Sequence, residues 1–238
     1  MRMSVVIPTW EANGEGHKVI QHALNSLSIQ TFKDFEVVVS DQSSDSLTEE
    51  VCKQWSDKLN IVYTKEENKK GYFTANENNG IKHSSGEIIK FLDADDFLYD
   101  FKSLEVINDA FTDSVNWLVT DYIHSLDRVG VFNRHLPVLN DRIYVVNTIG
   151  TPSCVAVRNI PDIPLFDENL KWAGDCEWYK RLFDKFGHPK VLSRCTAVHL
   201  LWQNNVETTM TNDQIRDEEI QYILSKHENK EIIIEETS

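Results

Sequence analysis

The sequence predicts an α/β protein with a mostly parallel central sheet flanked by helices. Two observations support this fold class. Short apolar runs alternate with stretches of helical periodicity through the first half of the chain, a pattern typical of right-handed strand–helix–strand crossovers. The fourth apolar run ends abruptly in the carboxylates of Asp93, Asp95 and Asp96. Ligands of such sheets bind at the carboxyl ends of the strands, where these three side chains would lie.

Each element of the first half follows from its own pattern. Apolar runs predict strands over residues 4–8, 35–40, 61–64 and 88–92. Helices are predicted over residues 47–55 and 74–83, and an earlier one by the stripe of Ile20, Ala23, Leu24 and Leu27, which recur at helical spacing.

The second half is less regular. Strands are predicted over residues 117–121, 142–146 and 152–157, around Val191 and over 196–202, with helices over 175–186 and 215–224. No repeat, low-complexity linker or internal domain boundary is evident. We therefore expect one domain over residues 1–210, with a first half over 1–100 and a more variable second half over 101–210, followed by a helix and polar tail over 211–238.

Composition limits the classes of partner. The chain has 238 residues, of which 41% are hydrophobic and six are tryptophan, so it can bury a sizeable core and is not expected to be disordered. Its net charge of −14 argues against nucleic-acid binding, which needs cations to neutralise phosphates. An acidic protein that binds an anionic nucleotide needs a positive group between the two, and a metal ion would supply it.

The cysteines and the hydropathy pattern bear on the setting. Cys52, Cys154, Cys176 and Cys195 are scattered without the close pairs of a zinc site. No apolar stretch approaches the roughly 18 residues of a membrane span. We expect a reducing, cytoplasmic environment.

The acidic cluster after the fourth strand suits a cation site. Residues two apart on an extended chain point to the same face, so Asp93 and Asp95 would project together, and converging carboxylates suit a hard divalent cation that also holds phosphate. The alternative is a solvated acidic loop. Asp41 follows the second strand and would lie at the same edge of the sheet, although an Asp there could simply bond its own turn.

Asp175 is the candidate catalytic residue. In a helix beginning near it, Trp178, Tyr179 and Leu182 share its face, whereas Glu177 points to the opposite side. A carboxylate on the apolar face of a helix either faces a cleft or caps the helix start. His199, in a predicted strand, is either a satisfied core residue or a ligand that completes a metal shell begun by carboxylates.

Four motifs together resemble the inverting family-two glycosyltransferases, which share the nucleotide-sugar-binding fold called GT-A. The motifs are Val-Val-Ile-Pro-Thr-Trp at 5–10, Ser-Asp-Gln-Ser-Ser-Asp at 40–45, the glycine-opened helix of Gly71, Ala75, Asn79 and Gly80 with Gly86-Glu87, and Asp-Ala-Asp-Asp at 93–96. A fifth stretch, Gly174-Asp175-x-x-Trp178-x-x-Arg181-Leu182, resembles the acidic motif of that family. The resemblance runs from about Met3 to Met210.

The resemblance implies a role for each matching residue. Thr9 and Asp41 would contact the nucleotide base, Asp93 the base and ribose, and Asp95 and Asp96 the ribose and a diphosphate bound to Mn²⁺ or Mg²⁺.

Two further roles follow from the same resemblance. Asp175 would be the general base, and His199 would lie near the metal or diphosphate. The chain departs from the family at Trp10-Glu11 (usually Tyr-Asn), Ser40 (commonly Asp) and Gly174 (usually Glu), and these departures bear on base identity and on activity.

The implied function is transfer of a sugar, with inversion, from a nucleoside-diphosphate sugar to an acceptor hydroxyl. UDP is the expected nucleotide, and the expected acceptor is a glycan or lipid-linked glycan of bacterial cell-surface polysaccharide (lipopolysaccharide O-antigen or capsule). Such an enzyme would be cytoplasmic or peripheral at the inner face of the plasma membrane. The alternative is a protein of the same fold that binds nucleotide sugars without turning them over.

Overall fold

The computed structural model describes residues 1–202 and 213–235. The strands are β1 (Met3–Thr9), β2 (Phe35–Asp41), β3 (Ile61–Lys65), β4 (Ile88–Phe91), β5 (Phe97–Leu98), β6 (Trp117–Ser125), β7 (Val131–His135), β8 (Val155–Arg158) and β9 (Lys190–Leu200). The helices are α1 (Gly16–Ser28), α2 (Leu47–Trp55), α3 (Phe73–Lys82), α4 (Ser103–Ala110), α5 (Gly174–Phe186) and α7 (Asp213–Glu235), with short 3₁₀ turns at Ala12–Gly14 and Pro152–Cys154.

One sheet runs through both halves of the chain in the order β3-β2-β1-β4-β8-β6-β9-β5, with β7 paired to β6. The four strands of the first half are parallel to one another. The second half adds antiparallel pairs, β4 with β8, β8 with β6, β6 with β7 and β5 with β9, and one parallel pair, β6 with β9. The predicted α/β class is confirmed, and the sheet is mixed because the second half reverses direction.

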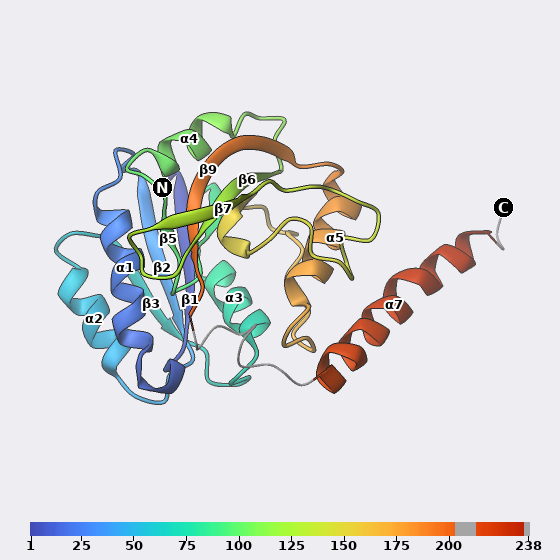
Figure 1. Ribbon diagram of the computed structural model, residues 1–238, viewed down its shortest axis with the longest axis horizontal. Helices are drawn as coiled ribbons and strands as arrows, with labels where there is room; N and C mark the ends of the chain where they lie inside the picture. Colours follow the sequence, from blue (N-terminus) through green and yellow to red (C-terminus); the bar gives the residue numbers. More distant parts are fainter. Residues whose placement is uncertain (203–212, 236–238) are drawn as a thin grey trace.

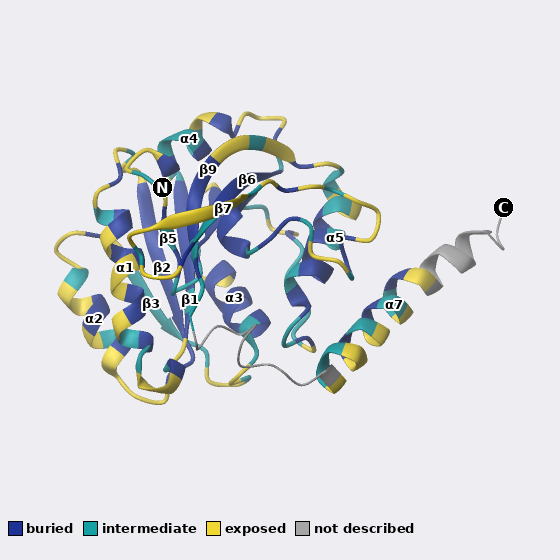
Figure 2. Cartoon of the chain, in the orientation of Figure 1, coloured by how far each residue is buried: buried dark blue, intermediate teal, exposed yellow. Residues whose placement is uncertain are grey.

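Helices cover both faces of the sheet (Figure 1). Alternate residues of β1 point to opposite faces: Val5 packs with α1, α2 and α4 in one cluster, and Val6 packs with α3 and α5 in another. β1, β2 and β4 are almost wholly buried, β3 at the edge of the sheet is partly buried, and the outer sides of the helices are exposed (Figure 2). This three-layer arrangement accounts for the continuous apolar runs of the central strands, since such strands are covered on both faces.

Because β1, β2 and β4 are parallel, their carboxyl ends meet at one edge. Thr9, the last residue of β1, pairs in register with Asp41, the last residue of β2. The turn that carries Asp93, Asp95 and Asp96 begins two residues after β4 ends. The edge expected from the sequence therefore carries the expected polar residues.

The predicted strand over residues 142–146 is wrong. Asn140 starts a turn instead, with its side-chain oxygen accepting from the N–H of Arg142 at 2.8 Å. The N–H of Val146 then bonds the carbonyl of Arg142 at 2.9 Å, so this segment coils locally rather than pairing with the sheet. Ile143 and Tyr144 are buried, and the apolar pattern reflects this packing rather than a strand.

Other elements also differ from the prediction: β6 extends to Ser125, and β5, α4 and β7 were not predicted. The segment predicted as a strand over 152–157 begins as the 3₁₀ turn Pro152–Cys154. β9 is one strand from Lys190 to Leu200, where two were expected, with register shifts against β6 between residues 120 and 122. α7 extends beyond the predicted 215–224 at both ends. Residues 203–210 of the predicted first domain lie outside the described residues.

α7 packs on α5 and on the segment before it. Ile223 is fully buried in a small cluster with Tyr144, Leu170 and Ala173. Glu177, which was expected to point away from the apolar face, does so but is fully buried, because α7 covers that side and supplies Lys226 at 2.6 Å. Within the described ranges, no helix is long and apolar enough to cross a membrane.

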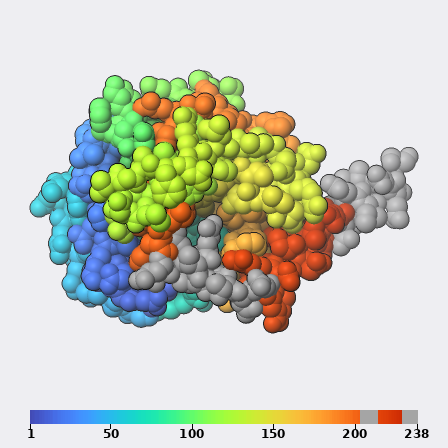
Figure 3. All heavy atoms as spheres, in the orientation of Figure 1, coloured from blue at the N-terminus to red at the C-terminus, as the bar shows by residue number. Residues whose placement is uncertain are grey.

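β7 and the loop after it spread across one face of the molecule (Figure 3). Several apolar side chains of this segment are exposed, among them Phe132, Leu136 and Val138. The chain then turns inward at Ile149, which is fully buried, and reaches the carboxyl edge of the sheet.

Candidate active site

A pocket of about 810 Å³ lies at the carboxyl edge of the sheet, between the two halves of the chain. Its lining includes Thr9, Asp93, Asp95, Asp175 and His199, so the structure brings together five of the seven residues singled out in the sequence. Among the described residues that line it, Lys171 is the only lysine or arginine. The pocket is therefore rich in carboxylates. Because these would repel an anionic ligand, such a ligand needs a cation between itself and the carboxylates.

Asp93 is held by the loop that leads into β8. Its carboxylate accepts a hydrogen bond from the Thr151 hydroxyl at 2.5 Å, and its backbone N–H donates to the Ser153 hydroxyl at 2.8 Å. Burial, together with the neighbouring carboxylates of Asp96 and Asp95, raises the pKa of Asp93 to about 7. Like charges this close cannot all ionise easily, so the cluster favours a bound proton or a bound cation.

Asp95 and Asp96 have different surroundings. Asp95 lines the pocket and accepts a hydrogen bond from the indole N–H of Trp202 at 2.7 Å. Asp96 is fully buried behind it and accepts from the backbone N–H of Leu200 and from Nδ1 of His199, both at 3.0 Å. Asp96 therefore joins the acidic turn to β9 and is not among the described residues that line the pocket.

His199 lies in β9 with its ring against the pocket. Burial disfavours its charged form, but the carboxylates of Asp96, Asp95 and Asp93 outweigh this and raise the pKa of His199 to about 10. Since Nδ1 is held by Asp96, the nitrogen left for a ligand is Nε2. A carboxylate that fixes the second nitrogen of a histidine is the usual support of a metal-binding imidazole.

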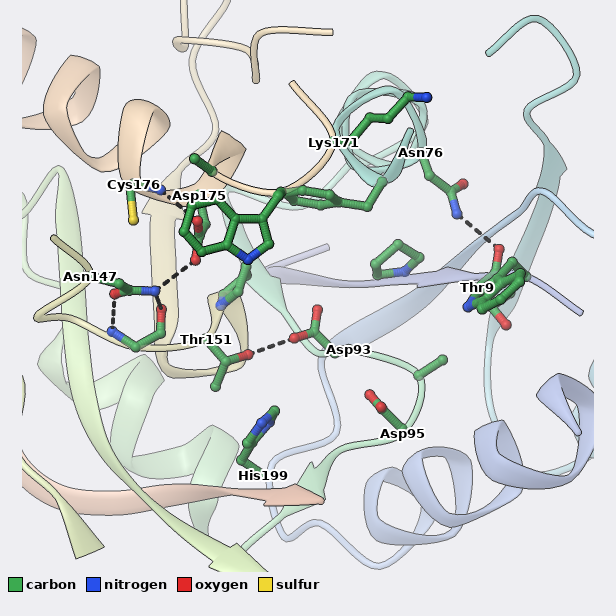
Figure 4. A pocket seen from close by; sticks show the side chains of 18 of the residues that line it. Thr9, Asn76, Asp93, Asp95, Asn147, Thr151, Lys171, Asp175, Cys176 and His199 are labelled. Atoms are coloured by element: carbon green, nitrogen blue, oxygen red, sulfur yellow. Dashed lines mark hydrogen bonds between the residues drawn. The ribbon is translucent and has the colours of Figure 1, made fainter. Parts of the chain in front are cut away.

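Asp175 is the second residue of α5 and faces the pocket (Figure 4). One carboxylate oxygen accepts from the backbone N–H of Cys176 at 2.7 Å, and the other from the side-chain amide of Asn147 at 2.8 Å. Burial is the main reason why the pKa of Asp175 is raised to about 7. Ala173 occupies the N-cap position, so Asp175 is not the N-cap residue, but its carboxylate takes one N–H of the first helical turn while it also lines the pocket.

Glu219 of α7 holds the segment that leads into α5. One oxygen of Glu219 accepts from the backbone N–H of Lys171 at 2.6 Å, and the other accepts from those of Trp172 and Ala173, each at 2.9 Å. These groups precede or begin the helix, where backbone N–H groups have no partner within the helix. Glu219 thus fixes the wall of the pocket that leads into Asp175.

Thr9 and Asp41 lie at neighbouring strand ends but have different exposure to the pocket. Thr9 lines it, and its buried hydroxyl has no hydrogen-bond partner among the described residues. Asp41 is fully buried, accepts from the hydroxyl of Tyr63 at 2.7 Å, and lies 3.4 Å from Lys65. The next residue, Gln42, reaches the pocket instead.

Sequence reasoning missed three residues that hold the site together. Asn147 and Glu219 form contacts between segments far apart in sequence, and no local pattern marks them. Lys90 was visible as one charged residue in the apolar run of β4. It is fully buried, and its ammonium group donates to the carbonyls of Ser153 and, at 2.7 Å, Phe91, which anchors the 3₁₀ turn beside Asp93.

The residues present fit a divalent cation shared with a substrate. Asp95 offers a carboxylate and His199 offers Nε2 to the same pocket, and Mg²⁺ typically takes one or two protein ligands plus phosphate oxygens and water. In the part of the chain that the structure describes, no three His, Cys, Asp or Glu side chains converge to hold a metal by themselves. A cation here would depend on ligands from the bound molecule.

The mixed sheet, the helices on both faces and the pocket at the carboxyl edge define a protein of the GT-A fold class. Residues 4–153 match the model of the family described as "Glycosyl transferase family 2". The chain belongs to that family, as the sequence motifs predicted.

Two curated relatives are similar to this chain in sequence, over different lengths. TarS of Staphylococcus aureus, a poly(ribitol-phosphate) β-N-acetylglucosaminyltransferase, is 28% identical over 172 residues, which cover 71% of this chain and 26% of TarS. A GalNAc(5)-diNAcBac-PP-undecaprenol β-1,3-glucosyltransferase of Campylobacter jejuni is 36% identical over 98 residues, which cover 41% of this chain and 30% of that protein. The chain thus matches less than a third of the length of either relative.

Solved structures agree on the fold. The crystal structure of S. aureus TarS 1–349 in complex with UDP-GlcNAc has a TM-score of 0.68 at 26% identity, covering 85% of this chain and 59% of that one. The mannosyltransferase PcManGT of Pyrobaculum calidifontis, in complex with GDP-Man and Mn²⁺, has a TM-score of 0.61 at 16% identity, covering 85% and 57%. At that identity the second likeness concerns the fold alone.

Proposed function

We propose that this chain transfers a sugar from a UDP-sugar to an acceptor hydroxyl and inverts the configuration at the sugar carbon. One observation carries the proposal: Asp175 faces the same pocket as Asp93 and Asp95, and its two carboxylate oxygens are both held in place. A single held carboxylate opposite a nucleotide-binding edge is what direct displacement needs.

The donor would lie over the carboxyl ends of β1 and β4. Thr9 and Gln42 offer polar groups to a base, and Asp93 offers a carboxylate to the ribose hydroxyls. Asp41 would act from behind the pocket wall, by holding the turn that carries Gln42. TarS is 26% identical to this chain over the matched structure and was solved in complex with UDP-GlcNAc. This likeness supports UDP as the nucleotide.

The acceptor hydroxyl would approach Asp175. As its oxygen attacks the sugar carbon, its proton passes to the carboxylate, and the bond between that carbon and the diphosphate breaks with its electron pair leaving on the phosphate oxygen. General-base help of this kind is typically worth about 10² to 10⁴ in rate. Inversion follows because attack comes from the side opposite the leaving group and no covalent intermediate forms.

Asp95 and His199 would hold Mn²⁺ or Mg²⁺ together with the diphosphate, and Asp96 would orient His199. When bound, the cation supplies positive charge to the departing diphosphate. The imidazole must be neutral to bind a metal, so uptake of the cation would displace the proton that the carboxylates now favour.

We place this activity in bacterial cell-surface polysaccharide synthesis, with a glycan or lipid-linked glycan as acceptor, at the cytoplasmic side of the membrane. The printed activities of the S. aureus and C. jejuni relatives, one on a poly(ribitol-phosphate) and one on an undecaprenol-linked glycan, support this setting.

The departure at Gly174 has a local explanation. A Cβ atom there would lie 2.2 Å from a methyl carbon of Thr74, so the glutamate usual in the family does not fit against this α3. The change therefore reflects packing and does not by itself argue for the inactive alternative.

The test is Asp175→Asn, assayed with Mn²⁺ and a panel of nucleotide sugars and acceptors. We expect UDP binding by calorimetry to stay within about twofold while transfer falls by about 10² to 10⁴. Asp184→Asn, a half-exposed carboxylate on the same helix, is the control and should behave as the unmodified chain. Equal turnover in both variants would refute the assignment, and UDP binding without turnover of any donor would favour the inactive alternative.

A further inference from the structure

Asn147 links Asp175 to the turn at Gly150. Its side-chain nitrogen donates to Asp175 at 2.8 Å and to the carbonyl of Gly150 at 3.3 Å, while its side-chain oxygen accepts from the N–H of Gly150 at 2.8 Å (Figure 4). The Gly150 N–H can only donate, so the side-chain oxygen must face it. The amide nitrogen must then face Asp175, and the alternative flipped amide is excluded.

The turn that carries Asn147 is rigid. Gly150 has φ of +113°, and a Cβ atom there would lie 2.2 Å from the ring of Tyr122, so no other residue fits. The carbonyl of Gly150 accepts from the hydroxyl of Tyr179 at 2.9 Å. Tyr179 lies one helical turn after Asp175 on α5, so the turn and the carboxylate are fixed to the same helix.

The same turn also reaches the donor side of the pocket. Thr151, the next residue, donates to Asp93 at 2.5 Å. Five consecutive residues, 147–151, therefore contact both the carboxylate assigned to the acceptor and the one assigned to the ribose. The relative position of the two is set by one short, rigid segment.

We propose that Asn147 is a positioning residue for Asp175: its amide holds one carboxylate oxygen as an acceptor and aims the remaining lone pair of that oxygen at the acceptor hydroxyl. This inference rests on the proposed role of Asp175 as general base. The N–H of Cys176 holds the other oxygen in the same way, so each oxygen keeps one lone pair and the two hydrogen bonds together fix the orientation of the carboxylate in the pocket.

Several charged and titratable groups near Asp175 influence its pKa, and the test must separate their effect from that of Asn147. Cys176 and Tyr179 on α5 and Asp93 across the pocket are the groups that interact with it electrostatically in the described part of the chain. Asp93 raises the pKa of Asp175, and the N–H of Cys176 lowers it. A donated hydrogen bond from Asn147 stabilises the ionised form, so its removal should move the pH dependence of turnover upward.

The experiment compares the pH profile of kcat in Asn147→Asp, Asn147→Ala and the unmodified chain. Asn147→Asp keeps the oxygen that accepts from Gly150 but replaces the donor to Asp175 with a second carboxylate. We expect its profile to move to higher pH by about one unit or more, since a like charge at this distance raises a pKa by that order. The KM for the UDP-sugar should stay within about twofold, because Asn147 does not belong to the proposed donor contacts.

Asn140→Asp is the matched control. Asn140 lies in the same loop and accepts from the N–H of Arg142 at 2.8 Å, but its amide donates to Thr148 instead. Asn140→Asp introduces the same charge into the same loop and should leave the pH profile of kcat unchanged. If Asn147→Asp does not fold, as judged by the loss of a cooperative melting transition, Asn147→Ala decides, with an expected upward shift of about half a unit or more.

Profiles that coincide for the unmodified chain and the folded Asn147 variants would overturn the proposal. If Asp175→Asn abolishes transfer while the Asn147 profile does not move, only the positioning role fails. If Asp175→Asn is fully active, the general-base assignment fails, whatever the Asn147 variants do.

Discussion

Glu219 of α7 accepts a hydrogen bond from the backbone N–H of Ala173, the residue that caps α5, at 2.9 Å. The same carboxylate also accepts from the N–H groups of Lys171 and Trp172, so a helix far along the chain holds the segment that leads into α5. The helix that carries Asp175 is therefore positioned from outside its own sequence.

Replacing Glu219 with alanine should lower the free energy of unfolding by about 1 to 3 kcal/mol, because three backbone N–H groups lose a charged acceptor. The melting temperature should fall by about 2 to 4 °C per kcal/mol, as measured by calorimetry. Glu218→Ala is the control, since Glu218 is exposed and accepts only from Gln214 among the described contacts. Equal melting temperatures for the two variants would contradict this role of Glu219.

The rate of transfer should depend on pH through Asp175. A general base works in its ionised form, and burial raises the pKa of Asp175 to about 7. Saturating turnover should therefore rise about tenfold per pH unit below that value and level off above it. A profile that is already flat between about pH 5 and 8 would show that the working base has an ordinary carboxylate pKa.

Metal-dependent nucleotide binding should require His199 and the carboxylate of Asp96 that holds its Nδ1. We expect Asp96→Asn to weaken the Mn²⁺-dependent binding of UDP by about 10- to 100-fold, because loss of the carboxylate that holds a metal-binding histidine has an effect of that size. His199→Ala should weaken it at least as much, and chelation of the metal should abolish the difference between variants. Calorimetry with and without Mn²⁺ measures this.

His188→Ala serves as the control for these variants. His188 packs on Phe183 near the end of α5 and does not line the pocket in the described structure. It should bind UDP and Mn²⁺ as the unmodified chain does. Unchanged binding in His199→Ala would remove His199 from the metal site.

Local patterns predicted the parts of the structure that local forces decide. Alternation of apolar runs and helical stripes indicated the parallel strands and their helices, and the parallel order of the strands predicted that Asp41 and Asp93 would lie at one edge of the sheet. Thr9 was singled out only through the resemblance to the family. The helical pattern also predicted that Asp175 and Trp178 point toward the interior. Trp178 is fully buried, and Asp175 lines the pocket.

Contacts between distant segments could not be predicted in this way. The apolar residues after Asn140 have the pattern of a strand, but a side-chain bond to the backbone starts a turn. Tyr144 then packs with Ile223 of α7, and Ile143 packs in the cluster of the sheet and α5. Glu177 was expected to face outward because the sequence does not show that α7 covers it. Asn147 and Glu219 act on residues 28 and 46 positions away, and only the folded chain places them there.

The position of Ile220 and Ile223 on α7 affects how the chain should be handled in practice. Ile220 lines the pocket and Ile223 is fully buried beside it, although both follow the last residue of the match to the family by more than sixty positions. Expression boundaries for crystallisation, inhibitor screening or chimeras with relatives should therefore extend through His227. A shorter fragment would keep the signature motifs yet present an incomplete cavity and an uncovered apolar seam.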